Sequence, residues 1–192
     1  MADSNITKRA LSSALRDLME EMPFEKITVA EICAKCDMNR KSFYYHFKDK
    51  YDLINWIFDT EFISFIQMLS ASEHSEDRFK AIYEICSYFD KNRSFYRKAF
   101  KIKGQNSFSE HFREWCQLLL KQRLTYLIGE DEANDFAVDF FADACLGSIE
   151  RWIMDKNPMS PEEFTARIKS LILNGTKALY KELNPTEPQT SI

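Results

Sequence analysis

The sequence predicts an all-α fold, in which a short N-terminal domain of three helices precedes a larger helical body. Through most of the 192 residues, apolar side chains recur at spacings of three and four, the pattern of amphipathic helices. The chain has only 4 glycines and 5 prolines, so the tight turns that connect β-strands are scarce. No stretch alternates apolar and polar residues as a half-buried strand does. With 45% hydrophobic residues, the chain can form a core around which such helices pack.

The first helix is expected over residues 5–22, where five apolar side chains fall on one face: Leu11, Ala14, Leu15, Leu18 and Met22. Pro23 ends it, because proline cannot continue a helix interior. Thr28 and Glu31 then have the spacing of a capping box, in which the threonine side chain binds the amide of the third helical residue and the glutamate reaches back. This box predicts a short second helix that ends at about residue 36.

Two more N-caps mark the helices that follow. The residues CDM make a turn, and Asn39 is a favourable N-cap for a third helix over residues 39–47. Asp49 can cap a fourth helix, which is expected to run from residue 50 to about residue 69. The polar stretch 70–77 then predicts a loop.

The remaining sequence predicts five further helices, separated by polar or proline-containing stretches: residues 78–90, 93–101, 107–127, 134–155 and 160–183. The last of them opens with Ser160 and Pro161 and has two glutamates in its first turn, where the positive end of the helix dipole favours acidic groups. The tail 184–192 is polar and contains proline, so we expect it to be flexible.

The third helix has two faces of different composition. On a helical wheel, Phe43 and Phe47 lie on one side and would anchor the helix to the two helices before it. The opposite side carries two lysines and two tyrosines, Lys41, Tyr44, Tyr45 and Lys48. Arg40 lies at the edge of this polar side, in the first turn. Residues 35–50 hold five cations and two anions, a local charge of +3 within a chain of net charge -4.

These features are those of a helix-turn-helix. Nine helical residues span about 13 Å, close to the width of the major groove of DNA, about 12 Å. Two short helices joined by a tight turn, the second of them cationic, are the arrangement that places the second helix in that groove. Arg40, Lys41 and Tyr45 are our candidates for contacts to base edges, because arginine to guanine is the commonest specific contact.

The segment ITVAEICAKCDMNRKSFYYHFKDKYDLI, residues 27–54, resembles the DNA-binding domain of TetR-family transcriptional regulators. The family pattern has a threonine-led second helix, a small residue before the turn, and an aromatic run ahead of a lysine and a leucine. The residues that match it are Thr28, Ile32, Cys33, Cys36, Phe43, Tyr44, His46, Phe47, Lys50 and Leu53. The family usually has glycine in the turn, where this chain has Asp37, a residue that tolerates left-handed backbone geometry. Residues 140–172 resemble, more loosely, a TetR subgroup related to regulators of dihydroxyacetone kinase operons.

The resemblance implies a cytoplasmic homodimer that binds a palindromic operator in double-stranded DNA, more often as a repressor of transcription than as an activator. It implies phosphate contacts by Tyr44, Lys50 and Thr28, whose donors suit phosphate oxygens. The full set of expected DNA-binding residues is Thr28, Asn39, Arg40, Lys41, Ser42, Tyr44, Tyr45, Lys48 and Lys50. The expected domains are a helix-turn-helix domain over residues 1–52, an effector-binding and dimerisation domain over 53–183, and the tail.

The resemblance also implies that the helical body controls DNA binding, and two kinds of partner remain open for it. A free small-molecule effector requires a buried concave pocket in each body. A protein coregulator, which the dihydroxyacetone kinase subgroup suggests for an activator, requires an exposed surface over a filled interior. The alternative from another class is an all-α interaction module that does not bind DNA, and a steep fall of DNA affinity with salt would exclude that module.

Two apolar stripes in the last two helices are expected to pair two subunits. The interface residues so predicted are Phe136, Phe140, Phe141, Ala144 and Trp152 in one helix, and Phe164, Ile168, Leu171 and Ile172 in the next. Two such helices from each subunit would make a four-helix interface; the alternative is that both stripes face their own core. Geometry favours pairing, because one short recognition helix gives modest specificity, whereas a twofold dimer reads two half-sites about 34 Å apart or a multiple of that spacing.

Cys33 and Cys36 form a Cys-x-x-Cys pair, which suits a redox site or half of a metal site. No second pair, no histidine at a ligand spacing and no βαβ pattern accompany them, so we interpret both as small hydrophobic residues of the domain core. His46 falls on the buried side of the third helix and is interpreted as a core histidine. The chain has no Ser-His-Asp order and no glycine-rich phosphate loop, so we expect no enzyme, no cofactor and no metal site.

Composition limits the other classes of protein. A net charge of -4 argues against indiscriminate coating of nucleic acid, although a small cationic patch still attracts a partner through its local field. The first residues, MADSNITKRAL, lack the apolar core of a secretory leader. The apolar stretch of the fourth helix is interrupted by Asp59 and Glu61 and is too polar for a membrane span. Five cysteines without a disulfide-scaffold spacing are typical of a reduced cytoplasm.

Overall fold

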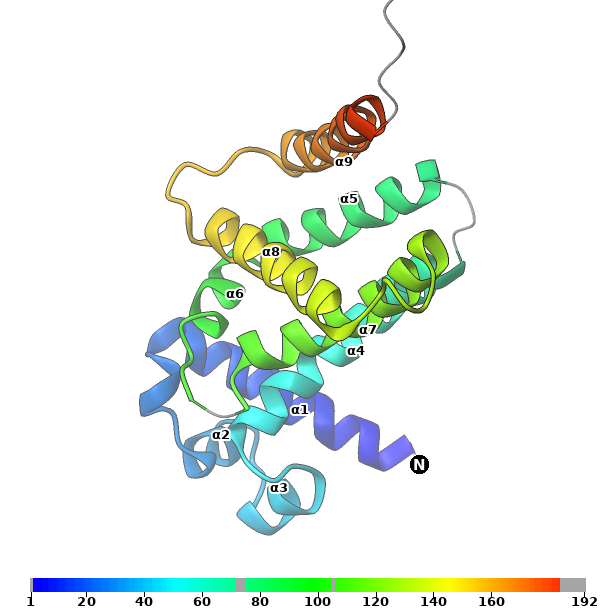
Figure 1. Ribbon diagram of the computed structural model, residues 1–192. Coiled ribbons are helices and arrows are strands. Elements are labelled where there is room, and N and C mark those ends of the chain that lie inside the picture. Colours follow the sequence, from blue (N-terminus) through cyan, green and yellow to red (C-terminus); the bar gives the residue numbers. More distant parts are fainter. Residues whose placement is uncertain (1, 72–74, 105, 184–192) are drawn as a thin grey trace, which may run out of the picture.

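The computed structural model describes residues 2–71, 75–104 and 106–183, and over those residues it contains helices and no strand (Figure 1). The all-α class predicted from the sequence is confirmed. The tail 184–192 lies outside the described residues. The elements are α1 Ala2–Glu21, the 3-10 helix η1 Phe24–Lys26, α2 Val29–Lys35, α3 Arg40–His46, α4 Lys50–Ala71, α5 Ser75–Lys91, α6 Arg93–Ala99, α7 Phe108–Ile128, α8 Asp135–Met154 and α9 Pro161–Leu183.

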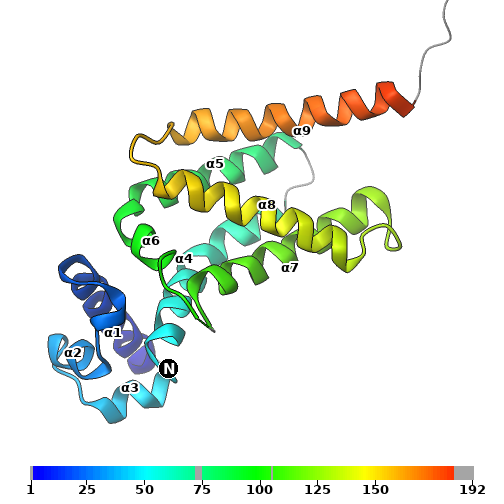
Figure 2. The ribbon, with the colours of Figure 1, turned by 60° about the vertical axis from the view of Figure 1, so that its left-hand side comes forward.

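The first three helices form a small domain at one end of the molecule (Figures 1 and 2). Their common core holds side chains that are at most 3% exposed: Leu11, Leu15, Ile32, Phe43 and Phe47. From this domain α4 leads into the body as one continuous helix. The expected domain boundary at residue 52 therefore falls within the first turn of a helix that both parts share.

The helix caps of the N-terminal domain have the geometry that the sequence predicts. Thr28 opens α2 with a complete capping box. The side-chain oxygen of Asn39 accepts a hydrogen bond of 2.8 Å from the amide three residues on, and opens α3. The side chain of Asp49 accepts from two amides in the first turn of α4, each at 2.8 Å. Between α2 and α3, Asp37 has a φ of 55°, the left-handed geometry that a glycine usually provides.

The body is built from α4 to α9. Helices α7 and α8 form an antiparallel pair, α9 lies along α5, and α4 packs against both α5 and α7 (Figure 2). The interior is aromatic, with buried rings from α4, α5, α6 and α7 and from the residue after α6: Phe58, Phe62, Phe89, Tyr96, Phe100, Phe108 and Phe112. Neighbouring ring centroids lie 4.2 to 6.3 Å apart, in stacked, tilted or edge-to-face pairs, within the range of favourable aromatic contacts.

Some helix ends differ from the predicted ones. The predicted loop 70–77 is largely helical, because α4 extends to Ala71 and α5 begins at Ser75; residues 72–74 lie outside the described residues. Polarity alone does not end a helix, and the acidic residues 76 and 77 suit the first turn of α5. Within the described ranges, no helix is both long and apolar enough to cross a lipid bilayer.

Candidate nucleic-acid interface

Helix α3 turns its apolar side inward and its polar side outward. Phe43 and Phe47 are 0% and 3% exposed, whereas Tyr44 and Tyr45 are 52% and 82% exposed. The charged side chains of the same face, Arg40, Lys41 and Lys48, are exposed as well. The arrangement on the wheel therefore holds in three dimensions, and α3 offers a cationic, phenolic face to a partner.

Both ends of α3 are held in place by contacts with neighbouring segments. At its start, the turn from α2 is closed by a hydrogen bond of 2.9 Å from the Met38 amide to the Cys33 carbonyl. At its end, the ring of Phe47 lies 5.7 Å from that of Trp56 in α4. The Lys48 amide then donates to an Asp52 carboxylate oxygen at 2.9 Å. These contacts with the preceding turn and with α4 hold the exposed face of α3 in a fixed position.

Among the residues that the structure describes, no carboxylate pairs with the cations of this face, which are Arg40 and Lys41 in α3 and Lys48 two residues beyond its end. No ion pair in that part of the chain involves Arg40, Lys41 or Lys48, and the Arg40 guanidinium lies 6.0 Å from the ring centroid of Tyr44. Lys35 of α2 differs, because its ammonium pairs with Glu21 at 2.6 Å. The charge that is free to meet an anionic ligand is therefore concentrated on α3.

Thr28 and Glu31 make the N-terminus of α2 acidic. The Thr28 hydroxyl donates to the Glu31 carboxylate at 2.7 Å, and the Thr28 amide donates to the same oxygen at 2.8 Å. These hydrogen bonds lower the pKa of Glu31 below its ordinary value. The threonine side chain is exposed, but its hydroxyl is already engaged in the cap. The structure accounts for Thr28 as the cap of α2. Its contact with a phosphate stays a prediction.

Lys50 is placed differently from the other cations. Its ammonium donates to the carbonyl oxygens of Phe24 at 2.7 Å, Glu25 at 3.1 Å and Ile27 at 2.7 Å. It also lies 4.6 Å from the centre of the Phe24 ring, and its partial burial lowers its pKa. An ammonium has three donors, and all three point at the connection between α1 and α2. We therefore assign Lys50 to holding that connection. Its contact with a phosphate stays a prediction.

Replacing Lys50 with methionine is expected to lower the free energy of unfolding by about 1–3 kcal/mol, because charge-assisted hydrogen bonds are lost and carbonyls are left unpaired. Methionine keeps most of the packing against Phe24. Urea unfolding measures the effect. The matched control is Lys26→Met, which removes an exposed charge from the same connection and is expected to change stability little. Equal stability of the two variants would contradict this role of Lys50.

The cysteines and the histidine of the domain lie in packed surroundings. Cys33 is 2% exposed, and the Cys36 thiol is half-buried, with its sulfur 3.3 Å from the Ile32 carbonyl oxygen. Burial raises the pKa of both thiols. His46 is half-buried, with its ring 4.9 Å from that of Tyr45. In the part of the chain that the structure describes, no group of three or more His, Cys, Asp or Glu side chains could hold a metal ion.

In the folded protein, Cys33 and Cys36 are expected to react with a thiol reagent more slowly than in the urea-unfolded chain, because the thiolate is the reactive form and burial disfavours it. Mass spectrometry of the labelled protein assigns the reaction to each cysteine. Fast labelling of these two thiols in the native state, at the rate of the unfolded chain, would revive a redox function for the pair.

Lys8 is a cation near the α3 corner that the sequence analysis did not single out. Its ammonium lies 5.8 Å from the ring centroid of Phe47 and 5.6 Å from that of Trp56, where α3 meets α4. The sequence feature that could have pointed to Lys8 is the positive charge of residues 4–16. This segment contains Lys8, Arg9 and a third cation, and it has no acidic residue. This end of α1 adds positive charge beside the exposed face of α3.

The predicted subunit interface divides into exposed and buried residues. On α8, Phe136, Phe140 and Phe141 are 79%, 60% and 43% exposed, and Ala144 is exposed beside them. Of the interface residues predicted on α9, Leu171 and Ile172 are exposed, at 75% and 50%. Exposed aromatic residues in one stripe are the mark of an interaction surface.

Trp152 and Phe164 do not belong to that exposed surface, contrary to the prediction. They are 4% and 8% exposed, and their rings stack at 4.6 Å and 7° within the chain's own core. The Trp152 indole donates to the Met159 carbonyl at 2.8 Å, which closes the loop between α8 and α9. Ile168 is half-buried against the same core. The residues of the two predicted apolar stripes are therefore divided between the chain's own core and its exposed surface.

A partly buried carboxylate, with a side chain 28% exposed, lies beside the aromatic rings of the body. The Glu61 carboxylate of α4 pairs with Arg16 of α1 and accepts hydrogen bonds from the phenols of Tyr88 and Tyr96. Burial raises the pKa of Tyr88 to about 12, and it raises the pKa of Tyr96 as well, so both phenols stay protonated donors. The aromatic core around this group is packed ring against ring.

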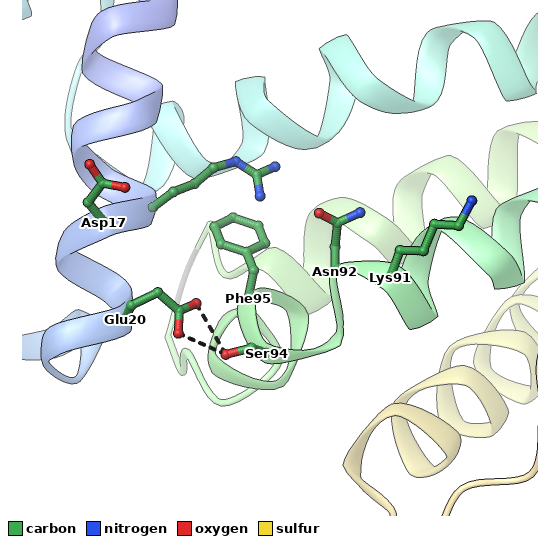
Figure 3. Close-up of a pocket in the computed structure, with 7 residues that line it drawn as sticks. Asp17, Glu20, Lys91, Asn92, Ser94 and Phe95 are labelled. Carbon is green, nitrogen blue, oxygen red and sulfur yellow. Dashed lines mark hydrogen bonds between the residues drawn. The ribbon is translucent and has the colours of Figure 1, made fainter.

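Two concavities stand out on the described surface, and both are open to solvent. One, of about 200 Å³, lies between α1 and the junction of α5 with α6 (Figure 3). Polar side chains dominate its lining, which comprises Arg16, Asp17, Glu20, Lys91, Asn92, Ser94 and Phe95. The other, of about 520 Å³, lies over the pairing of α7 with α8 and is lined by Gln117, Leu118, Lys121, Asp135, Val138 and Asp139. Neither has the enclosed, mostly apolar form of a typical small-molecule site.

Comparison with known proteins agrees with this geometry. Residues 11–57 match the family model described as "Bacterial regulatory proteins, tetR family", and residues 76–174 match the model described as "Transcriptional regulator C-terminal region". The chain is 30% identical over 123 residues to the HTH-type dhaKLM operon transcriptional activator DhaS of Lactococcus lactis subsp. lactis strain IL1403. That match covers 63% of this chain and 63% of the relative's length.

Two solved structures share the fold. The dihydroxyacetone kinase operon activator DhaS superimposes with a TM-score of 0.60 at 24% identity, over 90% of this chain and 97% of the other. A TetR transcriptional regulator from Streptococcus agalactiae 2603V superimposes with a TM-score of 0.67 at 18% identity, over 89% of this chain and 96% of the other. At these identities the likeness shows a common arrangement of helices, from the helix-turn-helix to the C-terminal body.

Proposed function

The chain belongs to the TetR family of bacterial regulatory proteins, and on that premise we propose that it regulates transcription by binding a palindromic DNA operator as a cytoplasmic homodimer. The observation that carries the proposal is the orientation of α3: Phe43 and Phe47 are buried while Tyr44, Tyr45 and the cations beside them are exposed. A rigid, cationic helix of this size fits the major groove. The chemistry is binding, and no catalytic step is involved.

In this proposal the residues of the exposed face have two functions. Arg40, Lys41 and Tyr45 contact base edges, and they carry the sequence preference. Tyr44 and Lys48 contact phosphates and fix the position of the helix on the duplex. Asn39 and Ser42 are proposed to contact DNA at the start of α3, where the Asn39 side chain also caps the Ser42 amide. Lys50 and Thr28 support the fold of the domain through the contacts described above.

The homodimer is proposed to form through the exposed part of α8 and α9. Phe136, Phe140, Phe141 and Ala144 would meet their counterparts around a twofold axis, with Leu171 and Ile172 at the edge. A twofold interface brings each residue close to its symmetry mate or to that mate's neighbours. Burying these exposed rings removes apolar area from water, which is the main favourable term in association. Two recognition helices then read two half-sites.

Selection of bound fragments from random duplex DNA tests the proposal. We expect the recovered fragments to share two inverted half-sites whose centres are separated by about one or two helical turns. The matched control is the same selection with a variant in which Arg40, Lys41 and Lys48 are replaced with alanine. A failure to enrich any sequence, or an equal enrichment by the variant, would favour the all-α interaction module instead.

Regulation is proposed to act through a protein coregulator. The aromatic interior is filled, and the two concavities described above are open and shallow. This is the arrangement expected for a protein partner and not for a buried small-molecule effector. The curated relative and one of the solved structures are both named DhaS, an operon activator. We therefore infer activation of transcription in place of the repression that the family resemblance first suggested.

Fractionation of a cell extract from the source organism separates these two kinds of partner. Operator affinity is measured for the purified protein alone, with the dialysable fraction, and with the protein fraction. We expect only the protein fraction to change the affinity or the length of DNA protected. A change caused by the dialysable fraction would show that a small molecule binds, and would contradict the coregulator.

A further inference from the structure

The segment that joins α7 to α8 is a hairpin held by its own contacts, and it projects from the body away from α3 (Figure 2). The Lys121 ammonium of α7 donates to the Ala133 carbonyl at 2.7 Å. The side chain of Asn134 caps the first turn of α8 by accepting a hydrogen bond of 3.0 Å. Leu124, Ala133 and Val138 form a small buried cluster at this end of the two helices. The hairpin is therefore preformed, so a partner that binds it has little ordering entropy to overcome.

A ridge of α7 that leads to this hairpin carries apolar side chains that the chain's own core does not cover. Leu118 is 52% exposed and Tyr126 is 81% exposed, and Gln122 between them is exposed as well. Residues four apart are neighbours on a helix surface, so the three side chains form one continuous ridge. Leu118 also lines the open concavity of about 520 Å³ between α7 and α8. Exposed apolar side chains grouped beside a groove with a polar rim are typical of protein–protein contact surfaces.

The rim of this ridge is acidic. Residues 126–139 contain five acidic residues and no basic one. Glu130, Asp131 and Glu132 are all exposed, and no ion pair within the described part of the chain involves them. Two cations of α7 pair instead with aspartates of α8, on the side where these two helices meet. The charge that the hairpin offers to a partner is therefore negative, opposite to that of the α3 face.

This negative charge argues against two other occupants of the ridge. DNA is disfavoured, because its phosphates carry charge of the same sign. A second copy of the chain is disfavoured as well, because a twofold contact brings the same patch of both copies together. The acidic residues 130–132 of one copy would then lie close to those of the other, and like charges across an interface cost binding energy. A protein with basic side chains is the occupant that the charge favours.

We propose that the protein coregulator docks on the hairpin surface, which comprises Leu118, Gln122 and Tyr126 with the acidic residues 130–132; this inference rests on the proposed function. The coregulator presents basic side chains around an apolar pocket that receives Tyr126. Aromatic anchors of this kind carry much of the binding energy of an interface, and charges at the rim speed association and select the partner. The surface lies outside the proposed dimer stripe of α8 and away from α3, so one molecule holds DNA and the coregulator together.

Operator titration with the protein fraction of the cell extract tests this surface. The probe is the protein fraction that changes the operator affinity of the wild type, added in a dilution series. A double variant with Leu118→Ala and Tyr126→Ala is expected to bind the operator as the wild type does in the absence of the fraction, because both side chains are exposed and lie away from α3. The amount of fraction that gives half of the effect is expected to rise roughly tenfold or more, since truncated anchors weaken an interface by that order.

A second double variant, with Asp131→Asn and Glu132→Gln, removes two charges of the rim and leaves the ridge intact. It is expected to need more of the protein fraction at low salt, and the difference from the wild type is expected to shrink at high salt, because salt screens exposed charges. The matched control combines Asp17→Asn with Glu110→Gln. These two residues are exposed on α1 and at the opposite end of α7, so the control removes the same charge elsewhere and is expected to respond as the wild type does.

The outcomes separate this docking surface from its alternatives. A wild-type response by the Leu118 and Tyr126 double variant, or an equal loss of response by the matched control, would overturn the proposal. Light scattering on the purified proteins provides a second readout: a wild-type mass above that of a dimer, reduced to a dimer by the same double variant, would show that a second copy covers the ridge, and would overturn it too. If the protein fraction leaves the wild-type operator affinity unchanged, the coregulator of the proposed function fails, and the docking surface fails with it. That last result is visible before any variant is made.

Discussion

Replacing Phe140 with glutamate is expected to convert the homodimer into a monomer and to lower operator affinity by on the order of a hundredfold or more. Phe140 is 60% exposed in the single chain, and in the proposed dimer it is covered by the second subunit. The substitution places a carboxylate in that contact twice, once from each subunit. An unpaired charge buried in this way costs on the order of 3–5 kcal/mol. Light scattering after size-exclusion chromatography measures the mass, and duplex titration measures the affinity.

Tyr126→Glu is the matched control for Phe140→Glu. Tyr126 is 81% exposed on α7, outside the proposed interface, and it undergoes the same change from an exposed ring to a carboxylate. This control is expected to remain dimeric and to bind the operator as the wild type does. A dimeric Phe140→Glu protein, or an equal loss of mass by both variants, would show that the subunits pair elsewhere.

Replacing Arg40 with alanine is expected to cost about 1–3 kcal/mol of operator binding and to relax the base preference at one position in each half-site. Arg40 stands in the first turn of α3, exposed and without a carboxylate partner among the described residues. Its side chain can therefore turn toward a guanine edge without breaking an ion pair. Titration with the selected duplex, with single-base variants of it and with random DNA measures the change.

Lys48→Ala is the comparison for Arg40→Ala. Lys48 is exposed at the other end of the same face and is proposed to contact a phosphate. Its removal is expected to weaken binding to every sequence by a similar factor, because phosphates carry no sequence information. If Arg40→Ala lowered affinity for selected and random DNA equally, the assignment of Arg40 to a base edge would be wrong.

The helices of this protein could be predicted closely because their signals are local. Thr28, Asn39 and Asp49 each bind an amide three residues along the chain, so each cap is visible in a short stretch of sequence. The two faces of α3 also follow from spacing alone, and the burial of Phe43 beside the exposure of Tyr45 agrees with the wheel. The left-handed turn at Asp37 was expected for the same reason.

Residues whose partners are distant in the sequence could not be placed in this way. Lys50 is positively charged like the cations of α3, so the sequence does not distinguish it from them. Its carbonyl partners lie 23 to 26 residues earlier in the chain. Trp152 and Phe164 lie on apolar stripes, and an apolar stripe looks the same whether it faces the chain's own core or a second subunit. Only the packing of the loop between α8 and α9 decides that the two rings stack against each other.

The contacts of α6 with the ends of α1 and α8 could not be recognised from the sequence for a further reason. Its cations are visible as Arg93, Arg97 and Lys98, but they bind backbone carbonyls, and every residue has a carbonyl. No residue type therefore marks the other side of the contact. The filled interior is equally hidden, because the same aromatic residues could line a pocket or pack against one another.

The dependence of operator affinity on salt tests the central claim, that the exposed face of α3 binds the phosphate backbone and bases of DNA. Affinity for the selected duplex is measured at several salt concentrations for wild type, for a Lys41→Ala and Lys48→Ala double variant, and for Lys35→Ala as the ion-paired control. We predict a steep wild-type slope that falls by about 2 in the double variant, because Lys48 is proposed to contact a phosphate and so to release one counterion in each subunit. The Lys35→Ala slope is predicted to match the wild type. A wild-type affinity that does not depend on salt, or a double variant with the wild-type slope, would contradict the claim.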